Sequence, residues 1–524
     1  MNQPNPVLAI ALDSAEPRLI EQWMKDGKLP NLKALRSRGA YGRLKSSSKW
    51  MAGSPWPTFY TGTEPAEHGI YESIQWRAQK MQYAKVTNDW LPVNPFYRQL
   101  NKELRIIAID VPMTQIPEPF NGIEICGWLT YDIMGLQTEG KPTSYPKTEI
   151  NILHERFGLE PFSIKSEEWG LQKVKSLLEI RDELIQATHR TGKLAKTLMK
   201  CEKWDLFMLA LAAPHRGGHK LWDLSGTYGR VSEGDRKEFS HALQDLYIAC
   251  DKVVGELIEA TSNETRILVF SLHGMGPNTC RPYLLPKLLP NILSRKSKYS
   301  GELKKKKSSI QKRMKQYIPN IWLSIGRNPE SFIIKLLKLL ESKLKNNGNT
   351  INSTPAFSLR SDMNGYIRIS LRGREKEGIV ESLKDYDRLC ADIIDEIKTM
   401  VDVDTGEPIV AQVVRSDELF KSGSRLEYLP DLIVRWVSSP SIKQRAITLS
   451  RDHSFYISTP KRNLDGRGGN HRSEGFLIAV GNGVAQNSQI HSGDILDLAP
   501  TICYLLGICK PVQMKGNSLW TNNK

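Results

Sequence analysis

The sequence predicts an α/β protein in which a mainly parallel central sheet is sandwiched by helices. Three observations support this: short apolar runs recur along the chain, helical periodicity follows them, and the composition is globular. With 40% hydrophobic and 25% charged residues among 524, the chain has enough apolar residues for a large core and shows no bias toward disorder. A chain of this length is expected to form one large domain with an insertion, or two domains.

Short apolar runs are typical of strands that are buried on both faces of a parallel sheet. The chain contains five such runs: Val7–Leu12, Ile106–Val111, Leu206–Ala213, Ile267–Leu272 and Phe476–Val480. After the first run, Pro17–Lys28 places its apolar residues on one helical stripe, which predicts a strand followed by a helix. Leu171–Met199 and Phe239–Ala260 are periodic and lack proline, so we expect them to be helices packed on the sheet.

A basic segment between residues 283 and 353 interrupts this pattern. Its lysines and arginines supply much of the formal charge of +16, and Ile333–Leu344 within it shows helical periodicity. We therefore predict an inserted basic helical cap at 283–353, with residues 1–282 and 354–524 forming the catalytic domain. A solvated linker, an anion-binding surface and a peripheral membrane contact all remain open for such a segment.

Other bulk properties exclude several classes of protein. The seven cysteines are scattered and form no C-x-x-C pair, so neither a disulfide framework nor a cysteine zinc site is expected. No apolar run approaches the ~20 residues that cross a bilayer, and the N-terminus lacks a secretory pattern, so we expect a cytoplasmic protein. No motif supports specific nucleic-acid recognition, and the oligomeric state has no signature in the sequence.

Residues that can bind a metal follow two of the predicted strands. Asp13 ends the first strand, and ligands of open α/β sheets gather beyond the carboxyl ends of strands. The alternative for Asp13 is to cap the following helix. In Pro214–His219, His215 and His219 stand four residues apart. This spacing places both imidazoles on one side of a helical turn, where they can hold one divalent ion.

Two further histidines occur in glycine-containing turns near predicted strands. His273 follows the run Ile267–Leu272, and His471 ends the glycine-rich stretch Gly466–His471. Glycines allow the backbone to approach a ligand closely. One such histidine would usually be structural, but their convergence with His215 and His219 at the ends of strands predicts a metal centre.

The order of these motifs resembles the alkaline phosphatase superfamily, in the branch of type I phosphodiesterases and nucleotide pyrophosphatases. The similarity spans most of the chain and ends with Asp494–Thr501. Thr61–Ile70 resembles the family signature T-G-x-x-P-x-x-H-G-I. The resemblance implies an alkaline phosphatase-like fold, two metal positions bridged by the substrate phosphate, and a serine or threonine that attacks phosphorus.

Carried over to this sequence, the resemblance implies one metal site with three histidine ligands, His215, His219 and His471. His215 replaces the aspartate of the family pattern P-D-x-x-G-H, but histidine is also a zinc ligand. Asp13 and His273 would form the second site, although Leu272 stands where the pattern S-D-H-G-M has a carboxylate. We therefore expect one or two divalent ions, with zinc as the metal and manganese as the alternative.

The nucleophile position departs from the family, because Ala52 stands where serine or threonine is expected. Ser54 is the predicted nucleophile, with Ser48, Thr58 or water as alternatives, and a helix-capping role for Ser54 also remains open. His68, within the signature, is expected either to support the site or to pack the following turn, and we favour the turn.

A strand-like stretch downstream, Asn364–Leu371, runs into a group of arginines. Arg368, Arg372 and Arg374 could meet an anionic substrate, yet exposed arginines on strands are usually only solvated. We therefore assign them no role in the site.

These features together predict a metal-dependent hydrolase that acts on small anionic phosphate esters by in-line attack at phosphorus. One alternative is a phospho- or sulfo-transferase or a sulfatase-like enzyme, but Ser54–Thr58 lacks the arginine of the sulfatase pattern C/S-x-P-x-R. A second alternative is a degenerate pseudoenzyme that binds an anionic ligand or partner. Metal content and turnover of bis(p-nitrophenyl) phosphate distinguish the hydrolase from the pseudoenzyme.

Overall fold

The computed structural model describes residues 5–86, 90–100, 102–114, 120–128, 142–158, 170–296, 354–439, 447–449, 457 and 465–520. The chain forms two compact units. Unit 1 comprises Met1–Ser73, Lys85–Asn278 and Arg462–Lys524, and unit 2 comprises Ile74–Ala84 and Thr279–Lys461. Most of the predicted basic cap, residues 297–353, lies outside the described residues. Unit 2 is larger than that segment, because it continues to Lys461.

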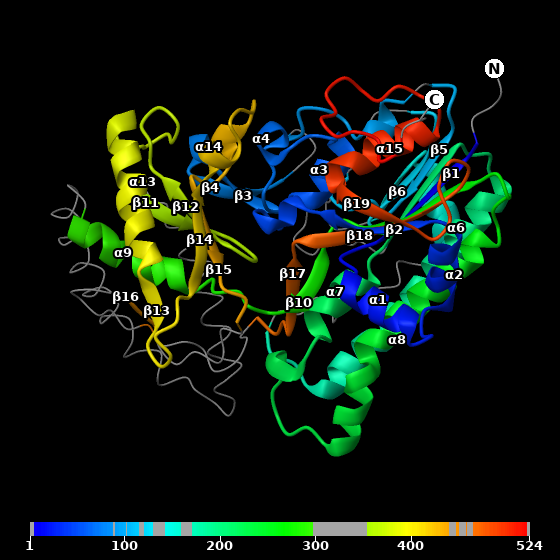
Figure 1. Ribbon diagram of the computed structural model, residues 1–524, viewed down its shortest axis with the longest axis horizontal. Coiled ribbons are helices and arrows are strands. Elements are labelled where there is room, and N and C mark those ends of the chain that lie inside the picture. Colours follow the sequence, from blue (N-terminus) through cyan, green and yellow to red (C-terminus); the bar gives the residue numbers. More distant parts are fainter. Residues whose placement is uncertain are drawn as a thin grey trace. The chain divides into compact units, whose positions relative to one another are not determined.

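Unit 1 is built on a nine-stranded sheet with the strand order β19-β2-β18-β9-β1-β8-β5-β6-β7 (Figure 1). Its centre consists of five parallel strands: β9 (Arg266–Ser271), β1 (Val7–Leu12), β8 (Leu206–Leu211), β5 (Ile106–Ile109) and β6 (Gly122–Cys126). The remaining strands are β19 (Ser488–Asp494), β2 (Ala40–Lys45), β18 (Glu474–Val480) and β7 (Thr143–Tyr145). Only β18 and β7 run opposite to the other strands. The predicted mainly parallel α/β fold is therefore confirmed.

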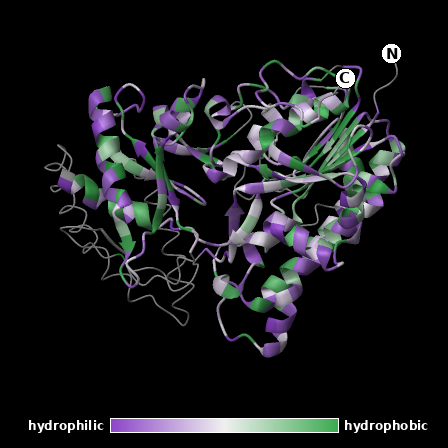
Figure 2. Cartoon of the chain, viewed as in Figure 1, coloured by the Kyte–Doolittle hydropathy of each residue, from purple (hydrophilic) through white to green (hydrophobic). Residues whose placement is uncertain are grey.

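Helices cover both faces of this sheet because successive side chains of a strand point to opposite sides. One face of β1, with Leu8 and Ile10, packs in a core with α1 (Pro17–Lys25), α2 (Pro30–Arg38), α6 (Val174–Cys201) and α8 (Glu233–Ile258). The other face, with Val7 and Ala9, packs in a core with α3 (Pro55–Thr61) and α15 (Leu498–Leu505). Figure 2 shows the central strands as hydrophobic along their length, whereas the helices alternate.

Shorter elements complete unit 1: α4 (Pro65–His68), α5 (Thr148–Phe157), α7 (Ala213–Lys220), β10 (Gly274–Pro277) and β17 (Gly469–Arg472). The strands β10 and β17 form a separate antiparallel ribbon. Within the part of the chain that the structure describes, no helix combines the length and the apolar character needed to cross a bilayer.

Unit 2 contains a four-stranded antiparallel sheet in the order β11-β12-β15-β14. These strands are β11 (Ala356–Leu359), β12 (Gly365–Ile369), β15 (Leu432–Trp436) and β14 (Val410–Arg415). Side chains of α9 (Leu284–Lys296) and α13 (Leu383–Lys398) pack on it in one core. The other elements are β3 (Ile74–Arg77), β4 (Gln82–Lys85), β13 (Met400–Asp402), β16 (Ile447–Leu449) and α14 (Ser416–Leu419).

Candidate metal centre

The first two histidines of the centre lie on α7, directly after strand β8. Pro214 stands in the first turn of α7, where its missing N–H is not needed and its fixed φ suits a helix. His215 and His219 follow one helical turn apart, and their ring centroids are 5.0 Å from each other. The predicted placement of both imidazoles on one side of a helical turn agrees with this geometry.

The third histidine comes from the ribbon of β10 and β17. His471 on β17 is the register partner of Met275 on β10, and β17 passes close to α7. A Cβ at Gly469 would lie only 2.1 Å from the carbonyl oxygen of Gly218, so this approach of the two backbones needs a glycine. The Nε2 atom of His471 then lies 3.2 Å from Nε2 of His215 and 3.1 Å from Nε2 of His219.

The hydrogen bonds at the far side of two rings determine which nitrogens carry protons. His215 Nδ1 lies 2.8 Å from Asp13 Oδ2, and His219 Nδ1 lies 3.1 Å from the carbonyl oxygen of Gly469. Because a carboxylate and a carbonyl oxygen only accept, both Nδ1 atoms donate and both Nε2 atoms present lone pairs. Burial, and then the nearby Arg467 and His215, hold the pKa of His219 well below its usual value, so its imidazole is neutral.

This donor set fits a zinc ion. Three nitrogens at about 2.0–2.1 Å from a tetrahedral zinc ion lie about 3.3 Å from one another, close to the two Nε2 separations around His471. Within the described residues, ligand atoms of His215, His219 and His471 all lie within 4.8 Å of one another. Neutral imidazoles whose lone pairs face a common point repel each other unless a cation or a shared proton lies between them.

Asp13, at the end of β1, contacts this centre through His215. Its side chain is buried, and Oδ1 accepts a hydrogen bond of 3.0 Å from Trp56 Nε1. Burial alone would raise the pKa of Asp13, but the neighbouring imidazoles and the Trp56 N–H hold it below its usual value. The helix-capping alternative does not apply, because Glu16 is the N-cap of α1 and accepts from the Arg18 N–H.

His273 and Asp13 flank a hydroxyl group. Ser14 Oγ lies 3.5 Å from Asp13 Oδ1 and 3.5 Å from His273 Nε2. The ring of His273 stacks on His471 with a centroid distance of 4.6 Å and an interplanar angle of 19°. Leu272 is 1% exposed and packs in the hydrophobic core. The residues carried over to the second metal position therefore supply a carboxylate and an imidazole, with the Ser14 hydroxyl beside both and no ligand atom at Leu272.

The predicted nucleophile Ser54 occupies the N-cap position of α3, but its side chain makes no capping bond. Ser54 is fully buried, and its Oγ lies 2.7 Å from the carbonyl oxygen of Met51 and 2.7 Å from Ser47 Oγ. Since a carbonyl only accepts, the Ser54 hydroxyl donates to Met51. The alternative Ser48 is also buried, and its hydroxyl donates to the carbonyl oxygen of Arg472.

The alternative Thr58 belongs to the same chain of hydroxyls as Ser54. Its Oγ1 lies 3.2 Å from Ser47 Oγ and 3.1 Å from His68 Nε2. His68 Nδ1 accepts from the Ile70 N–H, and burial lowers the pKa of His68 to about 3. The neutral ring therefore carries its proton on Nε2 and donates to Thr58. This arrangement matches the favoured expectation that His68 packs the turn, and it leaves His68 no lone pair toward the hydroxyls.

Three residues near the centre were given no role in the sequence analysis. Trp56 and Ser14 contact Asp13, and Arg467, whose Nε lies 2.9 Å from Asp465 Oδ2, lowers the pKa of His219. Arg467 lies inside the glycine-rich stretch that was singled out for His471, so that stretch was a usable signal. No periodicity or spacing indicates that the indole of Trp56 meets a carboxylate 43 positions earlier.

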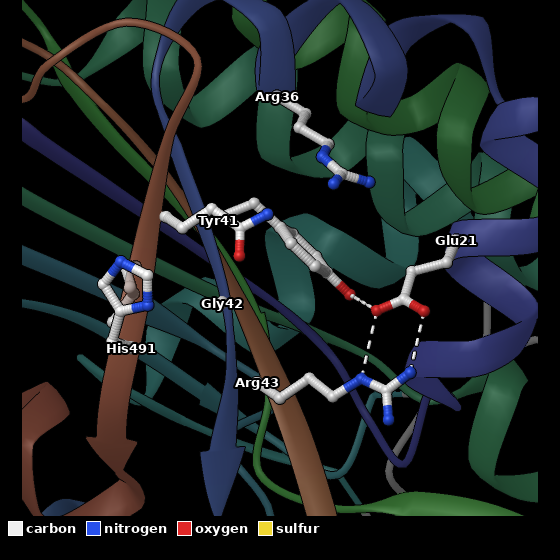
Figure 3. A pocket seen from close by; sticks show the side chains of 8 residues that line it. Glu21, Arg36, Tyr41, Gly42, Arg43 and His491 are labelled. Atoms are coloured by element: carbon white, nitrogen blue, oxygen red, sulfur yellow. Dashed lines mark hydrogen bonds and ion pairs between the residues drawn. The ribbon is translucent and has the colours of Figure 1, made fainter.

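A pocket of about 410 Å³ on unit 1 contains none of the predicted site residues (Figure 3). It is lined by Glu21, Arg36, Tyr41, Gly42, Arg43, Gln489, Ile490 and His491. Arg43 binds both carboxylate oxygens of Glu21, at 3.0 and 2.7 Å, and Glu21 also accepts from the Tyr41 hydroxyl at 2.8 Å. The Arg36 guanidinium lies 4.4 Å above the Tyr41 ring. The ion pair and the Tyr41 hydroxyl bond thus engage three of the polar side chains that line this pocket.

The arginines that follow β12 are used within unit 2. Arg368 Nε lies 2.6 Å from Glu375, and Arg374 binds both oxygens of Asp431, at 2.6 and 2.8 Å. Arg372 is exposed and pairs with an exposed glutamate at 3.2 Å. Their charges therefore serve internal and surface ion pairs, in line with our assigning them no role in the site.

The fold of the chain is similar to that of a solved hydrolase. The chain resembles phosphonoacetate hydrolase from Sinorhizobium meliloti 1021, solved with phosphonoformate and with phosphonoacetate, with a TM-score of 0.53 and 12% identity over 96% of each chain in both cases. Human ectonucleotide pyrophosphatase / phosphodiesterase 5 gives a TM-score of 0.46 and 13% identity, over 98% of this chain and 97% of that one. A comparison with curated proteins gives no match.

A family model extends this structural likeness to the sequence. The model described as type I phosphodiesterase / nucleotide pyrophosphatase matches residues 7–434. These residues include Asp13, the Thr61–Ile70 signature and both histidines of α7. The chain therefore belongs to the type I phosphodiesterase / nucleotide pyrophosphatase family of the alkaline phosphatase superfamily.

Proposed function

We propose that the protein is a metal-dependent hydrolase of phosphate esters and that zinc is its metal. The observation that carries the proposal is the convergence of three imidazole Nε2 atoms, with 3.1 and 3.2 Å between neighbours, in a chain of this family. An open position beside three histidines is the usual arrangement of a hydrolytic zinc site.

His215, His219 and His471 would hold the ion. A divalent ion held there acts as a Lewis acid toward a phosphoryl oxygen and lowers the pKa of water to about 7. Asp13 and the carbonyl oxygen of Gly469 keep two of the rings in the tautomer that offers Nε2, which is the usual role of groups that accept from the second nitrogen of a ligand histidine.

Arg467 lies close enough to His219 to lower its pKa and is only half-buried. Its guanidinium adds positive charge beside the centre, which favours an anionic substrate. The net charge of +16 acts in the same direction. We infer that the substrate is a small phosphate ester, which is a phosphorus oxyanion like the phosphonoformate and phosphonoacetate bound by the structural neighbour.

Water, rather than Ser54, supplies the attacking oxygen in this proposal. Ser54 is fully buried, and its hydroxyl donates a hydrogen bond to the Met51 carbonyl oxygen. His68 cannot act as a base for Ser54 through Thr58, because its own Nε2–H donates to Thr58. A serine nucleophile needs a base within hydrogen-bond reach. Attack by water breaks the phosphorus–oxygen bond of the ester in one displacement, without a phosphoryl-enzyme intermediate.

The proposal is tested by metal content and turnover of bis(p-nitrophenyl) phosphate in the wild type, in His219→Ala and in His491→Ala. We expect the wild type and His491→Ala to hold zinc and turn over, since His491 is exposed and outside the centre. His219→Ala should lose the metal and at least about 10³-fold in rate, because several kcal/mol of Lewis-acid stabilisation disappear at 1.36 kcal/mol per tenfold. A wild type with neither metal nor turnover would favour the pseudoenzyme.

A further inference from the structure

We propose that the centre takes a single divalent ion, and that Asp13 is a positioning residue that acts through His215 rather than a ligand of a second ion. This inference rests on the proposed metal centre and concerns its stoichiometry. It differs from the expectation that Asp13 and His273 bind a second metal, and four features of the site support it.

The first feature is the position of the Asp13 carboxylate. Asp13 Oδ2 accepts from His215 Nδ1 at 2.8 Å, and Oδ1 accepts from Trp56 Nε1 at 3.0 Å. A carboxylate that accepts from the far nitrogen of a ligand histidine fixes the ring orientation and makes the other nitrogen a stronger donor. Asp13 therefore makes the hydrogen bonds expected of a residue that orients a metal ligand.

The second feature is the residue at position 215. An aspartate there would bind an ion directly through its oxygens and would have no second nitrogen to donate to Asp13. A histidine has two nitrogens, and the 2.8 Å contact with Asp13 leaves Nε2 for the ion. A histidine at position 215 thus allows Asp13 to orient a ligand ring instead of only lying beside the centre.

The third feature is the small number of donors at the second position. Leu272 is 1% exposed and belongs to the core, and Ala52 is buried and has no donor atom. Of the residues that the family pattern places at this position, Asp13 and His273 remain as metal ligands, whereas protein zinc sites usually have three or four protein ligands.

The fourth feature is the backbone of Ser14. Its φ of 57° lies in the left-handed region, which a residue other than glycine seldom adopts. This conformation accompanies a placement of Oγ at 3.5 Å from both Asp13 Oδ1 and His273 Nε2. A hydroxyl therefore lies between the two groups that an ion would have to join. Strained backbone is retained where the surroundings require it.

The orientation of His273 separates it from the ion that His215, His219 and His471 would share. Its ring is nearly parallel to that of His471, at 19° and 4.6 Å between centroids. The lone pair of an imidazole lies in the plane of its ring, so two stacked rings direct their nitrogens along parallel planes and not toward one ion between them. Within the described residues, the group of histidines that can share an ion does not include His273.

The experiment measures zinc stoichiometry and affinity in the full-length chain. The protein is stripped with a chelator, loaded with zinc and analysed by atomic emission, and the Kd is obtained by competition with a chromophoric chelator. We expect one zinc per chain in the wild type. Asp13→Asn should still bind one zinc at saturation, with a Kd about 10- to 100-fold weaker, as is usual when the support of a ligand is lost.

Two further measurements separate positioning from a general structural effect. In the cobalt-substituted protein, Asp13→Asn should shift the d–d absorption bands, because the donor strength of His215 changes. His273→Gln serves as the matched variant on the other side of Ser14. It should leave the stoichiometry at one zinc per chain, whereas His491→Ala, outside the centre, should leave the Kd and the cobalt spectrum unchanged as well.

Specific results would overturn the inference. Two tightly bound ions in the wild type, with one lost in Asp13→Asn or His273→Gln, would make both residues ligands of a second ion. An unchanged Kd and cobalt spectrum in Asp13→Asn would remove its positioning role. If Asp13→Asn fails to fold, the wild-type stoichiometry and His273→Gln still decide. Zinc binding that survives His219→Ala would instead overturn the proposed metal centre itself.

Discussion

Each of the two units contains a largely buried polar cluster, and the two clusters are built in opposite ways. In the histidine centre of unit 1 (His215, His219 and His471), three similar groups direct nitrogens at one another from 3.1 and 3.2 Å. In the arginine–carboxylate network of unit 2 (Arg368, Arg374, Glu375 and Asp431), every arginine meets a carboxylate within 3.0 Å.

The difference indicates which cluster needs a partner from outside the chain. In the arginine–carboxylate network, Asp431 also accepts from the Tyr386 hydroxyl and the Ile369 N–H. Burial would raise the pKa of Asp431, but Arg374 and Arg368 hold it below its usual value. The network is complete as it stands, so we expect it to stabilise unit 2. In the proposed function the histidine centre is completed by a cation, so we expect it to act in function.

The largest effect that tests this comparison is on the stability of unit 2. Asp431→Ala should destabilise it by about 3–5 kcal/mol, because the largely buried Arg368 and Arg374 are then left with Glu375 as the one carboxylate of the network. Urea unfolding measures the loss, and hydrogen exchange followed by mass spectrometry should locate it in unit 2.

The control for Asp431→Ala is Glu381→Ala, which removes a partner of Arg372 from a pair that is about 60% exposed on both sides. An exposed pair contributes about 0–1 kcal/mol. Asp431→Ala should also keep the zinc affinity of the wild type. A loss of zinc without a loss of stability would reverse the roles given to the two clusters.

The second effect is stabilisation of unit 1 by zinc. At a free zinc concentration of 100 times Kd, the native state should gain about 2.7 kcal/mol, because the ion binds the folded centre and not the unfolded chain. Thermal unfolding with and without zinc measures the gain. It should disappear in His219→Ala and persist in His491→Ala. Equal gains in both variants would mean that zinc stabilises the chain from another place.

The elements of unit 1 were largely predictable because strands buried on both faces leave continuous apolar runs. The predicted run Val7–Leu12 is β1, and Leu206–Ala213 contains β8. The four-residue spacing of His215 and His219 likewise indicated one helical turn. The local sequence pattern was sufficient to predict a feature when the residues that form it are close together in the sequence.

The contacts that define the centre were not predictable in the same way. The bond between Asp13 and His215 joins residues 202 positions apart, and the stacking of His273 on His471 depends on two different turns. The family motifs predicted that Asp13 and His273 are metal ligands, but only the folded structure shows the hydrogen bond between Asp13 and His215. In the sheet of unit 2, the sequence indicated the stretch Asn364–Leu371, which contains β12, but not the other strands, because they lie in a region without long apolar runs.

Unit 1 also contains a third polar cluster, in which each group has a hydrogen-bond partner. This hydroxyl chain consists of Ser54, Ser47, Thr58 and His68. Because the folded pKa of His68 is lowered to about 3, the unfolded chain binds the extra proton when pH falls below about 6.5. Stability should therefore be complete above pH 6.5 and decline toward pH 3. At pH 5 the loss should be about 2 kcal/mol.

Urea unfolding of the zinc-free protein at pH 7 and pH 5 measures this loss. His68→Gln, which does not titrate, provides the control, since other histidines also respond to pH. The difference between wild type and variant should shrink by about 2 kcal/mol from pH 7 to pH 5. A difference that stays constant would mean that native His68 is protonated at pH 5, and its Nδ1 could then no longer accept from the Ile70 N–H.

The smallest effect concerns Ser54 and decides whether this third cluster is structural or catalytic. If water attacks phosphorus, Ser54→Ala should keep the rate of bis(p-nitrophenyl) phosphate hydrolysis within about tenfold, a change of 1.4 kcal/mol or less in the barrier. If Ser54 attacks, the same change should remove almost all activity, and the wild type should transfer phosphoryl groups to added alcohols through a covalent intermediate. Because zinc binding at the histidine centre does not involve Ser54, both outcomes are read at wild-type metal content. If Ser54→Ala binds zinc fully but shows no turnover, the hydroxyl chain has a catalytic role and not a structural one.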